Sequence, residues 1–368
     1  MKTRFIKHPY LLNLMALIFA LSACNKQADE KAKTLAPPLE IEEVMNFDKG
    51  GDGTYFRSIS FADEMHGVVV GVGSSYKNVI MSFRTTDGGN TWDSMDLPAD
   101  LLPFGNFAFG QYAVHFEKPD MGFLCGYTGN NTQGYIAKST DKGKTWVKKT
   151  QYVSSAPWQL DFDGDIGIAI GPSSLMVRST DGGETWSSVS NLPSPAENLE
   201  RIHMHDPDNY YVSSRVALWK STDKGATWQN VPVPSQSGSE LIFAGNYQMD
   251  SKTTGYVGNI HGISKTTDAG LTWNYITKFN TPYTHGNFFV LEKDVICFRN
   301  NVTKEFWISY DGGSNYKKFS IPINPIGAFD LTQYDLWHNF EVIGNYMYCW
   351  PANSYSGSKQ CLYRIKYK

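Results

Sequence analysis

The stretch Ser179–Trp186 reads STDGGETW, and copies of it recur along the chain. The copies share the order Ser/Thr-x-Asp-x-Gly-x-Thr-Trp, and the last copy has diverged. They are Thr85–Trp92 (TTDGGNTW), Ser139–Trp146 (STDKGKTW), Ser221–Trp228 (STDKGATW), Thr266–Trp273 (TTDAGLTW) and Ser309–Tyr316 (SYDGGSNY). The Asp carboxylate can accept backbone N–H groups inside a tight turn, and the Gly permits a positive φ. Each copy therefore predicts a β-hairpin.

The spacing of the copies predicts the fold class. Their Asp residues follow one another at intervals of 40 to 54 residues, and they are Asp87, Asp141, Asp181, Asp223, Asp268 and Asp311. A repeat of this length is what one four-stranded blade of a propeller requires. Three-residue stretches with apolar first and third residues, such as Val114–Phe116 (VHF), lie upstream of the copies and indicate the first strand of each blade. We expect an all-β fold, a β-propeller of antiparallel blades, over residues 39–368.

Seven blades are expected, because strand-like sequence continues beyond the sixth copy. Phe340–Trp350 and Gln360–Tyr367 have no octapeptide of their own. Leu39–Phe47 could join them from the N-terminal end, and such a closure would leave no exposed sheet edge. A six-bladed ring with a loose C-terminal extension is the alternative.

The octapeptide resembles the Asp-box, or BNR, repeat of sialidase-type propellers. In that family the box joins the third and fourth strands of a blade, opposite the usual ligand face. The resemblance implies that the six Asp residues are structural and do not take part in catalysis. The inner hairpin followed by the box also resembles the propellers of the photosystem II assembly factor family. That likeness is a pattern of repeats, and it carries no photosynthetic role with it.

The N-terminal segment is predicted to be an export signal. Lys2, Arg4 and Lys7 precede the short apolar stretch Tyr10–Leu21, which is too short for an ordinary spanning helix. The stretch ends in Leu-Ser-Ala-Cys at Cys24, which resembles a bacterial lipobox. This resemblance implies a lipoprotein signal peptide over residues 1–23 and a lipid on Cys24. An ordinary secretory signal with a chance cysteine is the alternative.

The predicted location follows from that signal. Residues 24–38 are polar and charged and end in two prolines, as a flexible tether would. We expect a monomer anchored through Cys24 to the bacterial cell envelope, at the outer membrane or the cell surface. The net charge is −3 and the mature chain has no basic run, which argues against binding to nucleic acid.

Four further cysteines could be oxidised in an exported protein. Cys349 and Cys361 flank a polar stretch between two strand-like runs, so they could form a disulfide across a hairpin or remain free. Cys125 and Cys297 are expected to be small buried side chains.

The first strand of each blade should line a central channel. Side chains one residue before the recurring apolar position should face it, and they are Ser60, His115, Asp161, His203, Gln248, Phe289 and Glu341. The residues two positions before each of these form a second, amide-rich ring. This ring lies near the upper mouth, the end of the channel at which the first strands begin. The candidate ligand-binding residues are Arg201, Gln159, Asn246, Asn287, Asn339, Trp158, His115 and His203. A hydrated channel whose polar groups satisfy one another is the alternative.

No complete catalytic set is evident. A sialidase needs an arginine cluster and a Tyr nucleophile. The segment most similar to the arginine motif of sialidases is Phe56–Ile59, which contains Arg57. The remaining candidate catalytic residues are Asp161 and Glu341. A metal held by His115, Asp161 and His203 would require a narrow channel, so no metal or cofactor is expected.

These observations favour a non-catalytic propeller that binds a glycan or an envelope protein. The alternative is a carbohydrate-active enzyme, either a sialidase-like glycoside hydrolase or a polysaccharide lyase.

Overall fold

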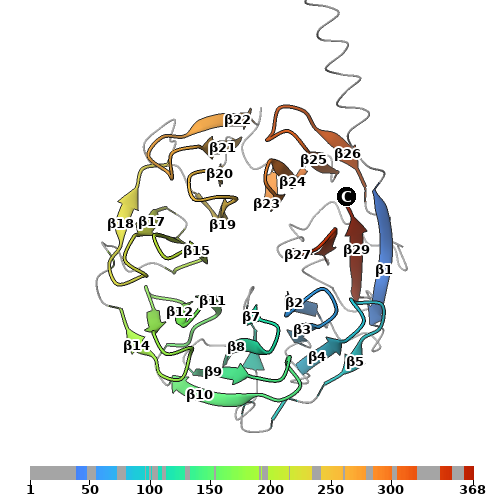
Figure 1. Ribbon diagram of the computed structural model, residues 1–368, viewed down its shortest axis with the longest axis vertical. Coiled ribbons are helices and arrows are strands. Elements are labelled where there is room, and N and C mark those ends of the chain that lie inside the picture. The colour runs from blue at the N-terminus through green and yellow to red at the C-terminus, as the bar shows by residue number, and fades with distance from the viewer. Residues whose placement is uncertain are drawn as a thin grey trace, which may run out of the picture.

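The protein forms a closed ring of seven antiparallel sheets around a central axis, seen end-on in the computed structural model of Figure 1. The structure describes residues 39–47, 55–72, 80–95, 97–98, 101, 107–109, 113–128, 133–152, 155–189, 192, 198–214, 216–233, 242–259, 262–278, 285–300, 305–320, 340–349 and 360–368. In these ranges, no helix is long and apolar enough to cross a membrane.

The sheets follow the chain in order, and each is a blade that runs from the axis outward. The first blade contains β2 (Tyr55–Phe61), β3 (Gly67–Val72), β4 (Ile80–Thr85) and β5 (Asp93–Ser94). The second contains β6 (Phe107–Ala108), β7 (Val114–Lys118), β8 (Met121–Thr128), β9 (Gly134–Ser139) and β10 (Val147–Tyr152). In this blade, β6 and β7 pair with successive parts of β8.

Four regular four-stranded blades follow. The third contains β11 (Gln159–Asp163), β12 (Ile166–Ile170), β13 (Met176–Ser179) and β14 (Ser187–Ser188). The fourth contains β15 (Arg201–Asp206), β16 (Asn209–Ser213), β17 (Leu218–Ser221) and β18 (Gln229–Val231). The fifth contains β19 (Ile242–Met249), β20 (Gly255–Asn259), β21 (Gly262–Thr266) and β22 (Asn274–Lys278). The sixth contains β23 (His285–Glu292), β24 (Val295–Asn300), β25 (Phe306–Ser309) and β26 (Lys317–Phe319).

The seventh blade joins the two ends of the chain. It contains β27 (Phe340–Ile343), β28 (Tyr346–Cys349), β29 (Gln360–Lys366) and, outermost, β1 (Glu40–Phe47). Strands β1 and β29 pair from Glu40↔Lys366 to Phe47↔Gln360, and Figure 1 shows them side by side on the rim. This closure confirms seven blades and excludes the six-bladed alternative.

All the described box turns that contact an inner hairpin do so at the same end of their blade. Gly88 N donates to Met65 O at 2.9 Å, and Met65 lies in the turn between the first two strands of that blade. Equivalent bonds join Gly182 to Asp165, Lys224 to Pro207, Ala269 to Thr253 and Gly312 to Asp294. The boxes and the inner turns therefore share one face of the ring, which we call the Asp-box face.

Each box is held by its own Asp. In the third blade, Asp181 Oδ1 accepts from Thr185 N at 2.9 Å and from Ser179 Oγ at 2.8 Å, while Oδ2 accepts from Thr185 Oγ1 at 2.6 Å. These bonds favour the carboxylate and lower the pKa of Asp181 to about 2, with the Thr185 hydroxyl as the main cause. In the diverged last copy, Asn315 Nδ2 donates to Asp311 Oδ2 at 2.8 Å, so Asn replaces Thr without loss of the bond.

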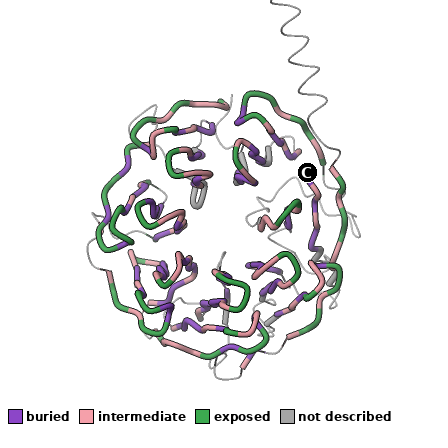
Figure 2. The backbone as a smooth tube through the Cα atoms, viewed as in Figure 1, coloured by how far each residue is buried: buried purple, intermediate pink, exposed green. Residues whose placement is uncertain are grey.

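The core lies between adjacent blades. The box Trp186 packs edge-on against Phe162, with ring centroids 5.7 Å apart, and Phe162 stacks on Phe123 of the preceding blade at 3.6 Å. Gly183 has a φ of +79°, and a Cβ there would lie 2.3 Å from the Phe123 ring. The box glycine is thus required by the turn and by the close approach of the preceding blade. Figure 2 shows buried residues along the inner strands and exposed residues on the outer strands and turns.

The prediction for the cysteines is partly wrong. Cys349 is a free, buried thiol, so the disulfide with Cys361 is not formed. The register explains this, because Cys349 lies opposite Tyr363 on β29, while Cys361 lies opposite Asn46 on β1. Cys125 and Cys297 are fully buried free thiols, as expected. Cys24, the signal peptide and the tether lie outside the described residues.

Candidate functional site

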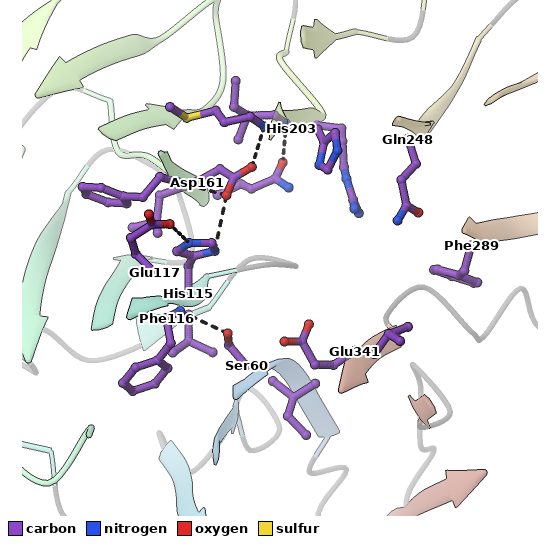
Figure 3. A pocket seen from close by; sticks show the side chains of 18 of the residues that line it. Ser60, His115, Phe116, Glu117, Asp161, His203, Gln248, Phe289 and Glu341 are labelled. Atoms are coloured by element: carbon purple, nitrogen blue, oxygen red, sulfur yellow. Dashed lines mark hydrogen bonds and ion pairs between the residues drawn. The ribbon is translucent and has the colours of Figure 1, made fainter. Parts of the chain in front are cut away.

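The central channel contains a cavity of about 500 Å³ that the first strands of all seven blades line. Figure 3 shows side chains from these strands directed toward its centre. The polar lining residues are Ser60, His115, Glu117, Gln159, Asp161, Arg201, His203, Gln248 and Glu341, and the aromatic ones are Phe116, Phe162 and Phe289. The alternation of side chains along a strand therefore places in the channel the whole ring of residues that the sequence aligned there.

Several predicted site residues lie elsewhere. Among the described residues, neither Trp158 nor Arg57 lines the cavity. Trp158 immediately precedes β11, donates from Nε1 to Leu199 O at 2.9 Å, and meets Tyr127 edge-on at 6.4 Å. Asn339 and the side chains of Asn246 and Asn287 lie outside the described part of the chain. That any of these residues binds a ligand stays a prediction.

Much of the polar lining bonds one blade to the next. Ser60 Oγ accepts from Phe116 N at 3.1 Å, and Asp161 Oδ2 accepts from Met204 N at 2.8 Å. Glu341 Oε1 accepts from Phe61 N at 3.3 Å across the closing interface. In each case a first-strand side chain satisfies a backbone N–H on the first strand of the following blade.

Two amides and a second hydroxyl make equivalent bonds. Gln248 accepts from Val290 N at 3.0 Å and donates to Val290 O at 2.9 Å. Nearer the upper mouth, Ser58 Oγ accepts from Val114 N at 3.1 Å and Gln159 Oε1 accepts from Ile202 N at 3.2 Å. We call Ser58, Ser60, Gln159, Asp161, Gln248 and Glu341 the inter-blade acceptors. They supply the free inner edges of the blades with hydrogen bonds, as buried polar groups require.

His115 forms a charged cluster with two carboxylates. Its Nδ1 lies 3.3 Å from Asp161 Oδ1 and its Nε2 lies 3.6 Å from Glu117 Oε2, while Glu117 Oε1 accepts from Gly164 N at 2.7 Å. Burial opposes the charged ring, but Glu117 and Asp161 outweigh it and raise the pKa of His115. The sequence alignment did not include Glu117, although the alternation that directs His115 into the channel also directs Glu117 there, two residues further along β7.

The other titratable groups of the channel are shifted by burial. Burial raises the pKa of Glu341 to about 7, although the Phe61 N–H and the charge of His115 favour its ionised form. Burial also raises the pKa of Asp161. Burial and the nearby charge of Arg201 lower the pKa of His203 to about 3, so this imidazole is neutral at neutral pH.

The arrangement offers charged and polar groups to a ligand. In the described ranges, no three His, Cys, Asp or Glu side chains form a group that could hold a metal ion. Figure 3 shows Asp161 and Glu117 around His115 on one side, His203 on another, Gln248 and Phe289 opposite, and Glu341 apart from the other two carboxylates. Arg201 also lines the cavity.

The repeat and the ring define the class of the protein as a BNR-type β-propeller. A family model described as "Photosynthesis system II assembly factor YCF48" matches residues 105–231, which are the second to fourth blades. The chain therefore resembles the photosystem II assembly factor propellers.

Curated relatives include enzymes and an assembly factor. A xyloglucanase of Paenibacillus sp. is 25% identical over 252 residues, which are 55% of this chain and 24% of the relative. The Photosystem II assembly lipoprotein Ycf48 of Synechococcus sp. (strain CC9902) is 24% identical over 169 residues, 44% of this chain and 46% of the relative. A sialidase of Bacteroides fragilis (strain YCH46) is 26% identical over 197 residues, 39% of this chain and 36% of the relative. The chain thus spans less than half the length of each of these relatives.

Solved structures share the ring. A structure titled "YCF48 bound to D1 peptide" has a TM-score of 0.60 and 14% identity, and the likeness covers 90% of this chain and 97% of that one. YCF48 from Cyanidioschyzon merolae has a TM-score of 0.63 and 15% identity, with 88% and 98% covered. The Niastella koreensis GH74 enzyme has a TM-score of 0.54 and 18% identity, with 76% and 46% covered. At these identities the likeness establishes the fold alone.

Proposed function

We propose that this protein is a non-catalytic, lipid-anchored propeller of the bacterial cell envelope that binds a segment of a partner protein across the mouth of its channel. The observation that carries the proposal is that the acidic side chains of the channel form hydrogen bonds between blades. Asp161 and Glu341, the candidate catalytic carboxylates, both accept backbone N–H groups across blade interfaces. Their first role is to hold the ring closed.

The bonding of Asp161 argues against a hydrolase. Glycoside hydrolysis requires two carboxyl groups that are free to exchange a proton or attack the sugar. Asp161 Oδ2 is bonded to Met204 N, and Oδ1 accepts from Phe162 N at 2.9 Å and contacts His115. Both oxygens therefore already hold the carboxylate in the wall between the third and fourth blades.

A polypeptide partner is supported by the likeness to assembly factors. The ring is similar to a YCF48 that was solved with a D1 peptide, and the family model covers the blades that contain His115, Asp161 and Arg201. The lipobox at Cys24 supports attachment to a membrane, and one relative is named a lipoprotein. The partner of this protein would accordingly be a membrane or envelope protein.

Site-specific photocrosslinking tests this proposal. A photoreactive amino acid in place of Trp158, next to the cavity, should give a discrete protein adduct in intact cells, which mass spectrometry identifies. The same amino acid in place of Lys148, on the outer strand β10, is the matched control and should give none. A purified segment of the identified protein should compete for the adduct. Adducts of equal yield from both positions, or specific binding on a glycan array instead, would contradict the proposal.

A carbohydrate-active enzyme is the second candidate. Asp161 and Glu341 share one cavity, and a pKa near 7 at Glu341 suits a general acid. Xyloglucan oligosaccharides and sialosides are the substrates to assay, because relatives bear those names. We expect no turnover. Turnover that disappears in Glu341→Gln would establish this function in place of the first.

A further inference from the structure

The charged groups of the cavity carry an excess of acid. Glu117, Asp161 and Glu341 face the cationic groups His115 and Arg201, and the neutral His203 adds no charge. His115 already lies between Glu117 and Asp161. Glu341 stands apart from that pair, on β27, and among the described groups it is bonded to the neutral backbone of Phe61.

The surroundings of the channel on the Asp-box face carry mixed charge. The turns between first and second strands contain Asp63 and Glu64, Asp163 and Asp165, Asp206 and Asp208, and Glu292 and Asp294, but also Lys118, Lys252 and Lys293. Lys142 and Lys265 pair with Asp63 at 3.4 Å and with Asp294 at 2.9 Å, and Lys368 pairs with Glu292. The excess of acid that would attract a cation therefore belongs to the cavity itself.

Phe289 and Glu341 line the cavity from adjacent blades. Phe289 is the one apolar residue in its ring of seven aligned positions, and it comes from β23 of the sixth blade, whereas Glu341 comes from β27 of the seventh. Figure 3 shows Phe289 and Glu341 well separated from each other along the same side of the cavity, with Gln248 beyond Phe289. An aromatic ring and a carboxylate that face one cavity are a favourable environment for an organic cation, because the ring quadrupole and the charge both attract it.

We propose that the channel receives a basic side chain, a lysine ammonium or an arginine guanidinium, from the bound polypeptide, and that Glu341 is its counter-charge. This inference rests on the proposed binding of a polypeptide and names the group by which the site would select its partner. The amide oxygen of Gln248 is a further acceptor in the same cavity.

Glu341→Gln tests the counter-charge without removing the structural bond. A glutamine at the aligned position of the fifth blade, Gln248, already accepts the backbone N–H of the next blade, so Gln at 341 can do the same for Phe61. Glu40→Gln is the matched control, because Glu40 is an exposed glutamate on the outer strand β1.

The probes are small amides of single amino acids, measured by isothermal titration calorimetry. N-acetyl-lysine methylamide and N-acetyl-arginine methylamide should bind weakly, and the norleucine and glutamate analogues should not. Glu341→Gln should weaken the binding of the cations about tenfold, which corresponds to the loss of one charge-assisted contact. Glu40→Gln should leave the affinity unchanged.

Binding of the cation should also depend on pH. It requires ionised Glu341, so the affinity should be full above pH 7 and fall about tenfold per pH unit well below it. Asp161, Glu117, His115, Arg201 and His203 are the other charged or titratable groups that line the cavity. The pKa of His115 is also raised, and protonation of this ring as pH falls adds positive charge to the cavity, which acts in the same direction as the loss of the Glu341 charge.

The outcomes separate this inference from the proposed function. Equal binding of the lysine, norleucine and glutamate amides, or an affinity unchanged by Glu341→Gln, would overturn the cation site. If the photocrosslinked partner segment still binds Glu341→Gln with wild-type affinity, the protein binds polypeptide but not through this charge. If that segment fails to bind the wild-type protein while the lysine amide binds, the proposed function fails and the cation site stands.

Discussion

Single Asp side chains determine the hairpin turns. Asp141 Oδ1 accepts from Thr145 N at 2.8 Å and from Ser139 Oγ at 2.9 Å, and Oδ2 accepts from Thr145 Oγ1 at 2.6 Å. Three donors that a turn would otherwise expose to solvent or leave unsatisfied are bonded to one carboxylate. This explains why Asp recurs in all six copies, whereas the residue directly after it varies among Gly, Lys and Ala.

Removal of one such carboxylate should measure its contribution. We expect Asp141→Ala to lower the free energy of unfolding by roughly 1–2 kcal/mol, because the turn loses several hydrogen bonds to a charged acceptor. Urea denaturation followed by Trp fluorescence gives this value. The exposed Asp93, on β5, is the control, and Asp93→Ala should change stability by less than about 0.5 kcal/mol. Equal effects of the two substitutions would show that the box carboxylate is dispensable.

Glu341 gives the stability of the ring a pH dependence of known sign. Its pKa is about 7 in the folded chain and near the ordinary value of 4.5 in the unfolded chain. The folded state therefore binds more protons between these values, so this group's contribution to stability falls as pH rises from about 4.5 to 7. A shift of this size corresponds to about 3 kcal/mol. Glu341→Gln should remove that slope in urea denaturation between pH 5 and pH 8, and Glu40→Gln should retain it.

The first strand of each blade has two functions at the level of the element. Its apolar side chains pack between blades, and its polar side chains bond the following first strand, as Gln248 does with both backbone groups of Val290. A strand at the edge of a sheet normally exposes such groups. The polar channel is thus explained by the geometry of the ring before any ligand is considered.

Loss of one inter-blade acceptor should destabilise the ring. Gln248→Ala removes both hydrogen bonds to the backbone of Val290, whose N–H and C=O then bond to water or stay unsatisfied. We expect the free energy of unfolding, measured by urea denaturation, to fall by about 1–3 kcal/mol. Gln229→Ala, at an exposed position of β18, should be neutral within about 0.5 kcal/mol. A neutral Gln248→Ala would mean that channel water replaces the side chain at no cost.

The sequence predicts the elements well and the contacts between them less well. The box hairpins and the ring of channel residues follow from local order and from the alternation of a strand. The bond between Asp161 and Met204 does not, because it depends on the register of one blade against the next. Glu117 could have been predicted, because it lies two residues after His115 on the same face of β7. The register that sets Cys349 opposite Tyr363, and not opposite Cys361, could not.

The whole molecule depends on one pairing between the ends of the chain. Strand β1 covers β29 over its length, and Arg364 reinforces the pair with a contact of 2.6 Å to Glu42. Seven blades could be predicted because strand-like sequence remained after the last box. The closure joins the two ends of the chain in one sheet and so completes the ring of seven packed blades.

Deletion of residues 39–47 should open this ring. The edge of β29 would then be exposed, and exposed edges promote association. We expect the shortened protein to form oligomers in size-exclusion chromatography with light scattering, and to be digested faster by protease. A chain that begins at Leu39 is the control and should behave as a monomer. A monomeric, protease-resistant deletion variant would contradict this role for β1.

The position of β1 also has a mechanical consequence. Any load applied to the chain upstream of Leu39 reaches the domain first at the strand that clasps the ring, and the ladder between β1 and β29 must carry it. Proteolytic cleavage between Leu39 and Phe47 would separate the domain from the chain upstream of it. The same cleavage would interrupt β1 and so weaken the pairing of β1 with β29 that closes the ring. Shedding and inactivation would then be one step, so a released fragment would not persist as an intact competitor for the partner.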